Sequence, residues 1–311
     1  MPCRASLRAR TFGSCPRSSN SRQGRGLPVL HAARSTGSYS GCVNDVPEPG
    51  TEPAVEPAPF GTAEILAAVA GARRVLDAGC GGGRLTISLA LAGAEVTGID
   101  TSGQRLAQAR GRAEAAGAEL TLLEGDFNAR LPFADASFDA VTSRLALMAA
   151  GDPVATLREL CRVLEPGGRL VTVLWASPAE NPWFGIPREA IAAVLGTERA
   201  SFARAFGRLG DPDEAAAVHR AAGLVEVEAI RLHERRTAPD AAAYWQELAA
   251  ENGHFRRVAA ALSDTEAAAL TAEVEARLAP YREGDHLSLP RTLVLVTSAR
   301  TKARLAISLS N

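Results

Sequence analysis

The sequence predicts an α/β protein with a doubly wound, mostly parallel sheet, and three observations support this prediction. Between residues 62 and 175, short apolar runs alternate with amphipathic segments of helical length. The first apolar run is followed at once by a turn rich in glycine. The first two runs each end on a carboxylate, Asp77 and Asp100. Ligands of open α/β sheets bind at such strand ends, so the pattern also predicts where a site lies.

The region before this alternation differs in composition. Residues 1–44 contain seven arginines and no acidic residue, and residues 45–59 contain five prolines. We interpret 1–44 as a disordered Arg/Ser-rich segment and 45–59 as a linker. A chloroplast or mitochondrial transit peptide and an over-long start are the alternatives for 1–44. No apolar run approaches the ~18 residues of a transmembrane helix, so we expect a cytoplasmic protein unless the segment is a transit peptide.

Residues 74–92 have the pattern of a strand, a tight turn and a helix. The predicted strand over 74–77 ends on Asp77, and the turn contains Gly79, Cys80, Gly81, Gly82 and Gly83. Glycine permits positive φ and lets a ligand approach bare backbone. A turn that merely reverses the chain is the alternative. Four glycines in five positions would weaken such a turn without a packing gain, so we favour a ligand-binding turn.

Two nucleotide cofactors compete for this turn. The dinucleotide fingerprint Gly-x-Gly-x-x-Gly needs a third glycine where the chain has Arg84 or Thr86. The chain instead reads Asp-x-Gly-x-Gly-x-Gly, which resembles motif I of the class I S-adenosylmethionine (SAM)-dependent methyltransferases. The resemblance implies that Asp77 places the methionine end of SAM and that the backbone of the turn approaches that end at Gly79, Cys80, Gly81 and Gly83. The methionine end is cationic and favours a carboxylate, whereas a pyrophosphate suits a bare helix N-terminus.

The strands predicted over 95–100 and 120–124 extend the resemblance. Asp100 matches the family acid that accepts both ribose hydroxyls. Its alternative role is to cap the helix predicted from residue 103, and the two roles can coexist. After the next strand, the resemblance implies that Asp126 accepts the adenine amino group and that Phe127 flanks the ring. An Asx-type turn with a core phenylalanine is the alternative.

The strand predicted over 138–142 precedes Ser143 and Arg144. The resemblance implies that Ser143 lies against the methionine portion of SAM. We interpret Arg144 as a contact to a carboxylate or to the substrate, with a surface salt bridge as the alternative. A helix capped by Asp152 follows and leads to a strand predicted over 170–175.

Over residues 62–175 the chain is similar to small-molecule and quinone-biosynthesis-type methyltransferases. This resemblance implies a seven-stranded, Rossmann-like methyltransferase domain over 60–300, whose last strands we place at 225–233 and 291–298. The final strand would insert antiparallel beside the strand at 170–175. Residues 176–210, with a helix around 188–195, and 238–288 interrupt this pattern as helical insertions, which we expect to cover the carboxyl edge of the sheet. Residues 301–311 form a tail.

The acceptor side carries weaker signals. The tetrapeptide Asn181-Pro-Trp-Phe184 resembles a motif of enzymes that methylate nucleic-acid bases, but that motif belongs directly after the strand at 138–142. We therefore expect no nucleic-acid partner. We interpret Trp183 and Phe184 as walls of an acceptor pocket, with a packing anchor as the alternative. Tyr244 is a further candidate substrate contact, but we favour a place for it in the core of a helical lid.

The predicted function is transfer of a methyl group from SAM to an O, N or C atom of a small-molecule acceptor by in-line displacement. The protein would contribute alignment and exclusion of water. No catalytic residue is assigned, and we expect no metal because the histidines and cysteines lack ligand spacing. The alternatives are a SAM-binding regulatory or assembly protein without transfer activity and, more distantly, a nicotinamide dehydrogenase. The sequence indicates neither the acceptor nor the oligomeric state.

Overall fold

The computed structural model describes residues 58–197, 199 and 207–302. The predictions for residues 1–44, for most of the linker at 45–59 and for the tail beyond residue 302 lie outside these residues. The same holds for positions 198 and 200–206 of the first insertion. Within the described part of the chain, no helix is long and apolar enough to cross a membrane.

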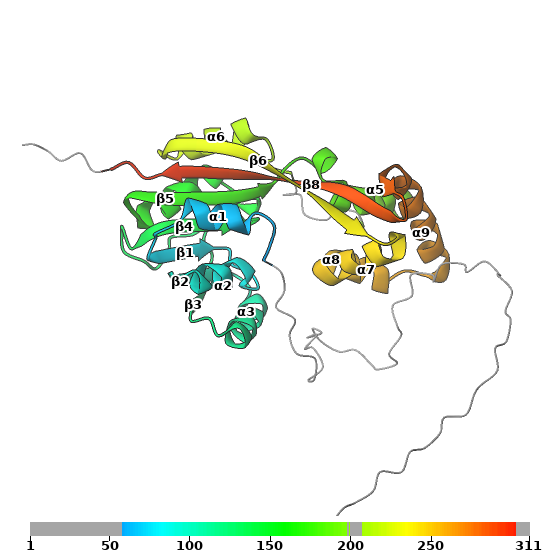
Figure 1. Ribbon diagram of the computed structural model, residues 1–311, viewed down its shortest axis with the longest axis horizontal. Coiled ribbons are helices and arrows are strands. Elements are labelled where there is room, and N and C mark those ends of the chain that lie inside the picture. Colours follow the sequence, from blue (N-terminus) through cyan, green and yellow to red (C-terminus); the bar gives the residue numbers. More distant parts are fainter. Residues whose placement is uncertain (1–57, 198, 200–206, 303–311) are drawn as a thin grey trace, which may run out of the picture.

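One sheet organises the structure (Figure 1), with the strand order β3-β2-β1-β4-β5-β8-β6. Strands β1 to β5 pair in parallel, and β8 pairs antiparallel with both β5 and β6. The doubly wound sheet and the antiparallel insertion of the final strand are therefore confirmed. The strand bounds are β1 Arg74–Ala78, β2 Glu95–Asp100, β3 Thr121–Glu124, β4 Phe138–Arg144, β5 Leu164–Trp175, β6 Val225–Ala238, β7 Arg282–Glu283 and β8 His286–Ala299.

Helices cover the sheet in two groups, as a doubly wound architecture requires. Helix α2 packs between α1 and α3, while α4 packs on α6. The central strands are apolar on both faces because both are covered, and Val75, Leu76 and Val141 are fully buried. The bounds are α1 Thr62–Ala68, α2 Arg84–Leu91, α3 Gly103–Ala116, α4 Pro153–Val163 and α6 Pro212–Ala221, with the 3-10 turn η1 at Leu147–Ala149.

The last two long strands extend beyond the rest of the sheet. β6 and β8 pair from Val225↔Ala299 to Ala238↔Leu287, whereas β5 pairs with β8 only as far as Trp175↔Leu293. Our strand predictions at 225–233 and 291–298 were therefore too short. The charged residues at the end of β6 and Pro290 in β8 hid this extension. The prediction for β5 also began too late, because pairing with β4 already starts at Leu164.

Four helices gather at the far end of the β6–β8 extension, on the side where β5 and β6 end (Figure 1). They are α5 Pro182–Leu195, α7 Ala241–Glu251, α8 Gly253–Ala260 and α9 Asp264–Leu278, accompanied by η2 Pro178–Glu180 and η3 Ala279–Tyr281. Helix α5 comes from the first insertion and packs on α9 from the second. The two insertions thus form one unit, which we call the helical cluster. The helix predicted around 188–195 begins earlier, because Pro182 is tolerated at the first helical position.

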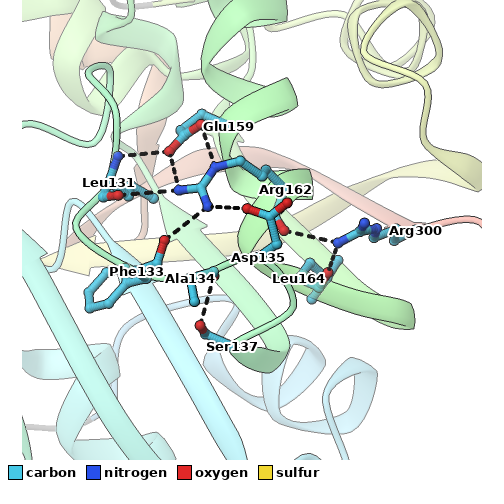
Figure 2. Close-up of polar contacts among 9 residues, drawn as sticks. All are labelled: Leu131, Phe133, Ala134, Asp135, Ser137, Glu159, Arg162, Leu164 and Arg300. Carbon is cyan, nitrogen blue, oxygen red and sulfur yellow. Dashed lines mark hydrogen bonds and ion pairs between the residues drawn. The ribbon is translucent and has the colours of Figure 1, made fainter.

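Arg162 on α4 holds the loop between β3 and β4 in place (Figure 2). Its guanidinium donates to the main-chain oxygens of Leu131 and Phe133 at 3.2 and 2.9 Å. It also forms ion pairs with Asp135 and Glu159, both at 2.6 Å. All five N–H donors are therefore used. Since this loop begins at Gly125, next to a predicted site residue, Arg162 helps to hold one wall of the candidate site in place.

Candidate cofactor and acceptor site

The glycine turn between β1 and α2 needs glycine for two different reasons. Gly79, Gly81 and Gly83 have φ of 77°, 54° and 78°. A Cβ at Gly79 would lie 2.3 Å from Ala146 Cβ, and one at Gly83 would lie 2.7 Å from Ala109 Cβ. We expected the glycines of this turn to bring no packing gain. This expectation is wrong for Gly79 and Gly83, where the lack of a side chain lets neighbouring residues pack closely. At Gly81 the nearest atom would be 3.9 Å away, so the main chain there remains open to a ligand.

Asp77 lies at the carboxyl end of β1 and is 1% exposed. Thr86 Oγ1 donates to one carboxylate oxygen at 2.7 Å, and Thr142 Oγ1 donates to the other at 3.0 Å. Burial raises the pKa of Asp77 to about 6, although the two hydroxyls and Arg144 act in the opposite direction. The sequence analysis missed both threonines. Thr86 follows the glycine turn closely, whereas Thr142 is brought in only by the pairing of β1 with β4.

Asp100 ends β2 and faces the same turn. Its two carboxylate oxygens accept hydrogen bonds from the amides of Gly81 and Ser102, each at 2.9 Å. A carboxylate offers about four acceptor positions, so each oxygen keeps capacity for a ligand hydroxyl. The residue that caps α3 is Ser102, whose hydroxyl accepts from the amide of Arg105 at 3.3 Å. Asp100 is therefore not the cap of α3, which was the alternative role that we considered for it.

Asp126 and Phe127 follow β3, and the structure shows the Asx-type turn that we named as the alternative. The Asn128 amide and side chain both donate to Asp126 Oδ1 at 2.8 Å. Asp126 is exposed, and its Oδ2 atom accepts no hydrogen bond from the described residues. Phe127 is 8% exposed, and its ring lies 3.3 Å from the position a Cβ would take at Gly79. The turn thus leaves one oxygen of Asp126 for a ligand and places Phe127 beside the glycine turn.

Cys80 and Ser143 are both buried, with different consequences. The Cys80 sulfur packs against Gly98, so the side chain points under the turn. Burial and the charges of Asp77 and Asp100 raise the pKa of this thiol, which keeps it neutral. The Ser143 hydroxyl has no hydrogen-bond partner in the described part of the chain. Because buried hydroxyls are normally paired, this atom near the end of β4 is a candidate ligand contact.

Arg144 is the last residue of β4 and does not form the surface salt bridge that we considered. Its Nε and Nη2 atoms donate to the Phe60 carbonyl at 3.3 and 3.1 Å. No ion pair involves it among the described residues. Burial lowers the pKa of Arg144 to about 10, with a further contribution from the charges of Arg291 and Arg84.

The aromatic residues proposed for the acceptor pocket are placed by packing. Trp183 and Tyr244 are fully buried, their ring centroids lie 4.6 Å apart, and the Tyr244 hydroxyl donates to the Trp183 carbonyl at 2.6 Å. The guanidinium of Arg236 lies 4.3 Å from the Trp183 ring centroid. This placement favours the packing alternatives for Trp183 and Tyr244. Phe184 is 9% exposed, and its ring lies 5.0 Å from that of Trp175 near the end of β5.

Asn181 shows why its tetrapeptide does not behave like a base-methylation motif. The residue is fully buried, and its side-chain amide donates to the carbonyls of Ala176, Ser177 and Thr292. Its carbonyl accepts from the Thr292 amide at 2.9 Å. The side chain therefore ties the start of α5 to β8 and is not directed at a ligand.

The buried histidine is also structural. His219 lies between the hydroxyls of Thr172 and Ser298, at 3.0 and 2.9 Å, and burial lowers its pKa to about 4. It links α6 to β5 and β8 as a neutral imidazole. Among the residues that the structure describes, no group of three or more His, Cys, Asp and Glu side chains could hold a metal ion.

A surface hollow lies away from all these residues. It is lined by Arg73, Arg74, Gly93, Glu95, Asp139 and Glu165. Since β1 and β2 begin at Arg74 and Glu95, the hollow lies at the amino ends of the strands. Ligands of open α/β sheets bind at the opposite, carboxyl ends.

The residues at the carboxyl ends fit SAM chemically. Asp77 offers a buried negative charge to a cationic group, and Asp100 keeps two acceptor positions for a pair of hydroxyls. Ser143 offers an unpaired hydroxyl, and Gly81 offers open main chain.

Comparisons with known proteins agree with this fit. Residues 76–172 match the family model of the methyltransferase domain. Over 116 residues the chain is 44% identical to demethylmenaquinone methyltransferase of Thermus thermophilus, covering 37% of this chain and 52% of that protein. It is 42% identical over 121 residues to an uncharacterized protein of Mycobacterium bovis, covering 38% and 43% of the two chains. The chain thus spans about half the length of the curated relatives it matches.

A solved structure extends the likeness of the fold beyond the matched domain. The YcgJ protein of Bacillus subtilis superposes with a TM-score of 0.53 at 18% identity, covering 78% of this chain and 98% of that protein. The likeness concerns the fold alone. The matched domain, the methyltransferase relatives and the residues at the strand ends together support a class I SAM-dependent methyltransferase domain over residues 76–172, with S-adenosylmethionine as its cofactor.

Proposed function

We propose that this protein transfers a methyl group from SAM to a small-molecule acceptor. The observation that carries the proposal is the position of Asp77, Asp100 and Asp126 at or directly after the carboxyl ends of β1, β2 and β3. These strands are adjacent, parallel and in register. Their three carboxylates therefore lie along one edge of the sheet, in the order in which a methionine end, a ribose and an adenine would follow one another.

Each group at this edge has a binding role in the proposal. Asp77 faces the cationic methionine end, Asp100 accepts the ribose hydroxyls, and Asp126 accepts the adenine amino group beside Phe127. Ser143 donates its free hydroxyl to the methionine portion. SAM supplies an electrophilic methyl group when bound, and the chain contributes alignment for in-line displacement and exclusion of water.

Isothermal titration with SAM tests the cofactor assignment. Asp100→Ala removes both remaining acceptor positions, so we expect an affinity at least about tenfold lower, as the loss of hydrogen bonds to a charged group implies. Asp213→Ala is the matched control, because Asp213 is an exposed acid in the first turn of α6. An unchanged affinity in Asp100→Ala would refute the assignment.

A second candidate is a SAM-binding regulatory or assembly protein without transfer activity. One observation that favours it is that His219, the buried histidine among the described residues, is held between two hydroxyls and is not available as a general base. Release of S-adenosylhomocysteine in an acceptor screen separates the two candidates. The family match ends at residue 172, before the helical cluster, so the acceptor of the Thermus relative does not carry over to this chain.

We further propose that the protein acts in the cytoplasm and has no nucleic-acid partner. The engagement of Asn181 with β8 supports the second point, because base recognition would need its amide free. The mass and compartment of the mature protein from its native source test the first point. Filter binding of labelled RNA and DNA tests the second.

A further inference from the structure

Three arginines come together at the carboxyl edge of the sheet, next to the proposed cofactor acid. Arg144 ends β4, Arg84 begins α2 after the glycine turn, and Arg291 lies in β8 just beyond the end of its pairing with β5. The charges of Arg291 and Arg84 both act on Arg144, opposed by those of Asp77 and Glu234. The two neighbouring arginines therefore add positive charge to the surroundings of Arg144.

The arginines differ in how they are neutralised. Arg291 forms an ion pair with Glu234, its neighbour in the β6–β8 pairing. Arg144 has only the Phe60 carbonyl, to which Nε and Nη2 donate. A guanidinium carries five N–H donors, so Arg144 retains donors that no described residue uses. A largely buried cation without an anionic partner is costly, and a ligand carboxylate would remove that cost.

Aromatic rings border this pair of arginines. The Arg291 guanidinium lies 5.2 Å from the ring centroid of Phe60 and 5.9 Å from that of Trp175. The Trp175 ring contacts that of Phe184 edge to face. Phe60 therefore joins the two arginines, since its carbonyl holds Arg144 and its ring lies under Arg291. A ligand here would meet a fork of donors suited to a carboxylate and a flat apolar wall.

We propose that Arg144, with Arg291 beside it, binds the carboxylate of the methyl acceptor, and that the acceptor is a small aromatic carboxylic acid. This inference rests on the proposed function and specifies its substrate class. The competing use of Arg144 is to bind the carboxylate of SAM itself. If Arg144 binds the acceptor, a carboxylate should still bind when S-adenosylhomocysteine occupies the cofactor site. If Arg144 binds the carboxylate of SAM, bound S-adenosylhomocysteine should block the added carboxylate.

The experiment titrates sodium benzoate into protein saturated with S-adenosylhomocysteine, in a chloride-free buffer. We expect saturable binding of benzoate and none of benzamide, which has the same shape without the charge. Arg144→Met should weaken benzoate at least about tenfold, as loss of a charge-assisted pair implies, and leave the affinity for SAM within about twofold. Arg110→Met, an exposed arginine of α3, is the matched control.

Three results would overturn the proposal. They are equal binding of benzamide, benzoate binding that survives in Arg144→Met, and benzoate that binds the free protein but is displaced by S-adenosylhomocysteine. The last result would assign Arg144 to the cofactor. If the wild type does not bind SAM at all, the proposed function itself fails, and the two failures are therefore distinguishable.

A second variant protects the test against misfolding of Arg144→Met. Glu234→Gln removes the charge that neutralises Arg291, so we expect benzoate to bind several-fold more tightly while benzamide stays unbound. Arg291→Gln should have the opposite effect on benzoate. A purely structural role for these arginines predicts no gain of anion affinity in Glu234→Gln, and the absence of that gain in a folded variant would count against the proposal.

Discussion

The two halves of the carboxyl edge are built in different ways. At the β1–β3 end, most of the hydrogen bonds described above join residues that are close in sequence, such as Thr86 to Asp77 at nine residues and Gly81 to Asp100 at nineteen, and the bond from Thr142 to Asp77 at 65 residues is the exception. At the β4–β8 end they join distant residues, such as Arg144 to Phe60 at 84 residues and Asn181 to Thr292 at 111. The half that we propose to bind the cofactor (the cofactor half) is thus mostly a local motif. The half that we propose to bind the acceptor (the acceptor half) depends on contacts made by the sheet and the helical cluster.

The largest change in stability that we expect comes from a substitution in the helical cluster. Trp183→Ala removes the indole ring that packs against Tyr244 and Arg236 and leaves a cavity. We expect a loss of about 3–5 kcal/mol in the free energy of unfolding. The affinity for SAM in the folded variant should not change, because the cofactor half does not use this contact. Chemical denaturation and SAM titration measure the two quantities.

Leu91→Ala is the control for this variant, because Leu91 is 60% exposed and its truncation should stay within about 0.5 kcal/mol. A stable Trp183→Ala protein with impaired acceptor turnover would instead support Trp183 as a pocket wall.

The next effect concerns the glycine turn. Gly79→Ala combines a positive φ with a contact of 2.3 Å to Ala146 Cβ, and we expect a cost of about 2–3 kcal/mol and a correspondingly weaker binding of SAM. Gly93→Ala is the matched control, because Gly93 has φ of 96° but no atom within 4 Å of the added Cβ. It should cost about 1 kcal/mol and leave SAM binding unchanged. Equal losses of SAM affinity in both variants would show that strain alone is responsible.

The smallest effect is a pH dependence that belongs to the cofactor half. Burial raises the pKa of Asp77 from 3.8 to about 6. Folding therefore favours the protonated acid, and the contribution of Asp77 to stability falls as pH rises from about 4 to about 6. A cationic ligand needs the ionised form, so SAM affinity should fall by about tenfold for each pH unit below 6.

Titrations of SAM between pH 5 and pH 8 measure this slope. Asp77→Asn should bind SAM more weakly at every pH and should lack the slope. The ligand-free Asp77→Asn protein should also gain stability relative to the wild type as pH rises through 6. A wild-type affinity that stays constant down to pH 5 would contradict the assignment of Asp77 to the cationic end.

The sequence predictions were more accurate for the β1–β3 end of the sheet than for the β4–β8 end. The strand, turn and helix around Asp77 were predictable because each step depends on neighbouring residues, and the antiparallel insertion of the final strand beside β5 followed from the family resemblance. The extension of β6 and β8 was missed because residues such as Glu234 and Arg235 are charged, and only pairing across the sheet makes them strand. The role of Trp183 as a packing residue was left open because its partner Tyr244 lies 61 residues away.

The sequence by itself therefore determined the sheet, the glycine turn and the identity of the cofactor, since positive φ and strand-end carboxylates leave a local pattern. Tertiary structure alone decided that Thr142 holds Asp77, that Phe60 holds Arg144, and that the two insertions form one helical cluster. The physical reason is that these contacts join residues with no periodic relation in sequence. Arg144 could be named from the sequence, but its unshared charge was visible only once the sheet had placed it beside Arg291.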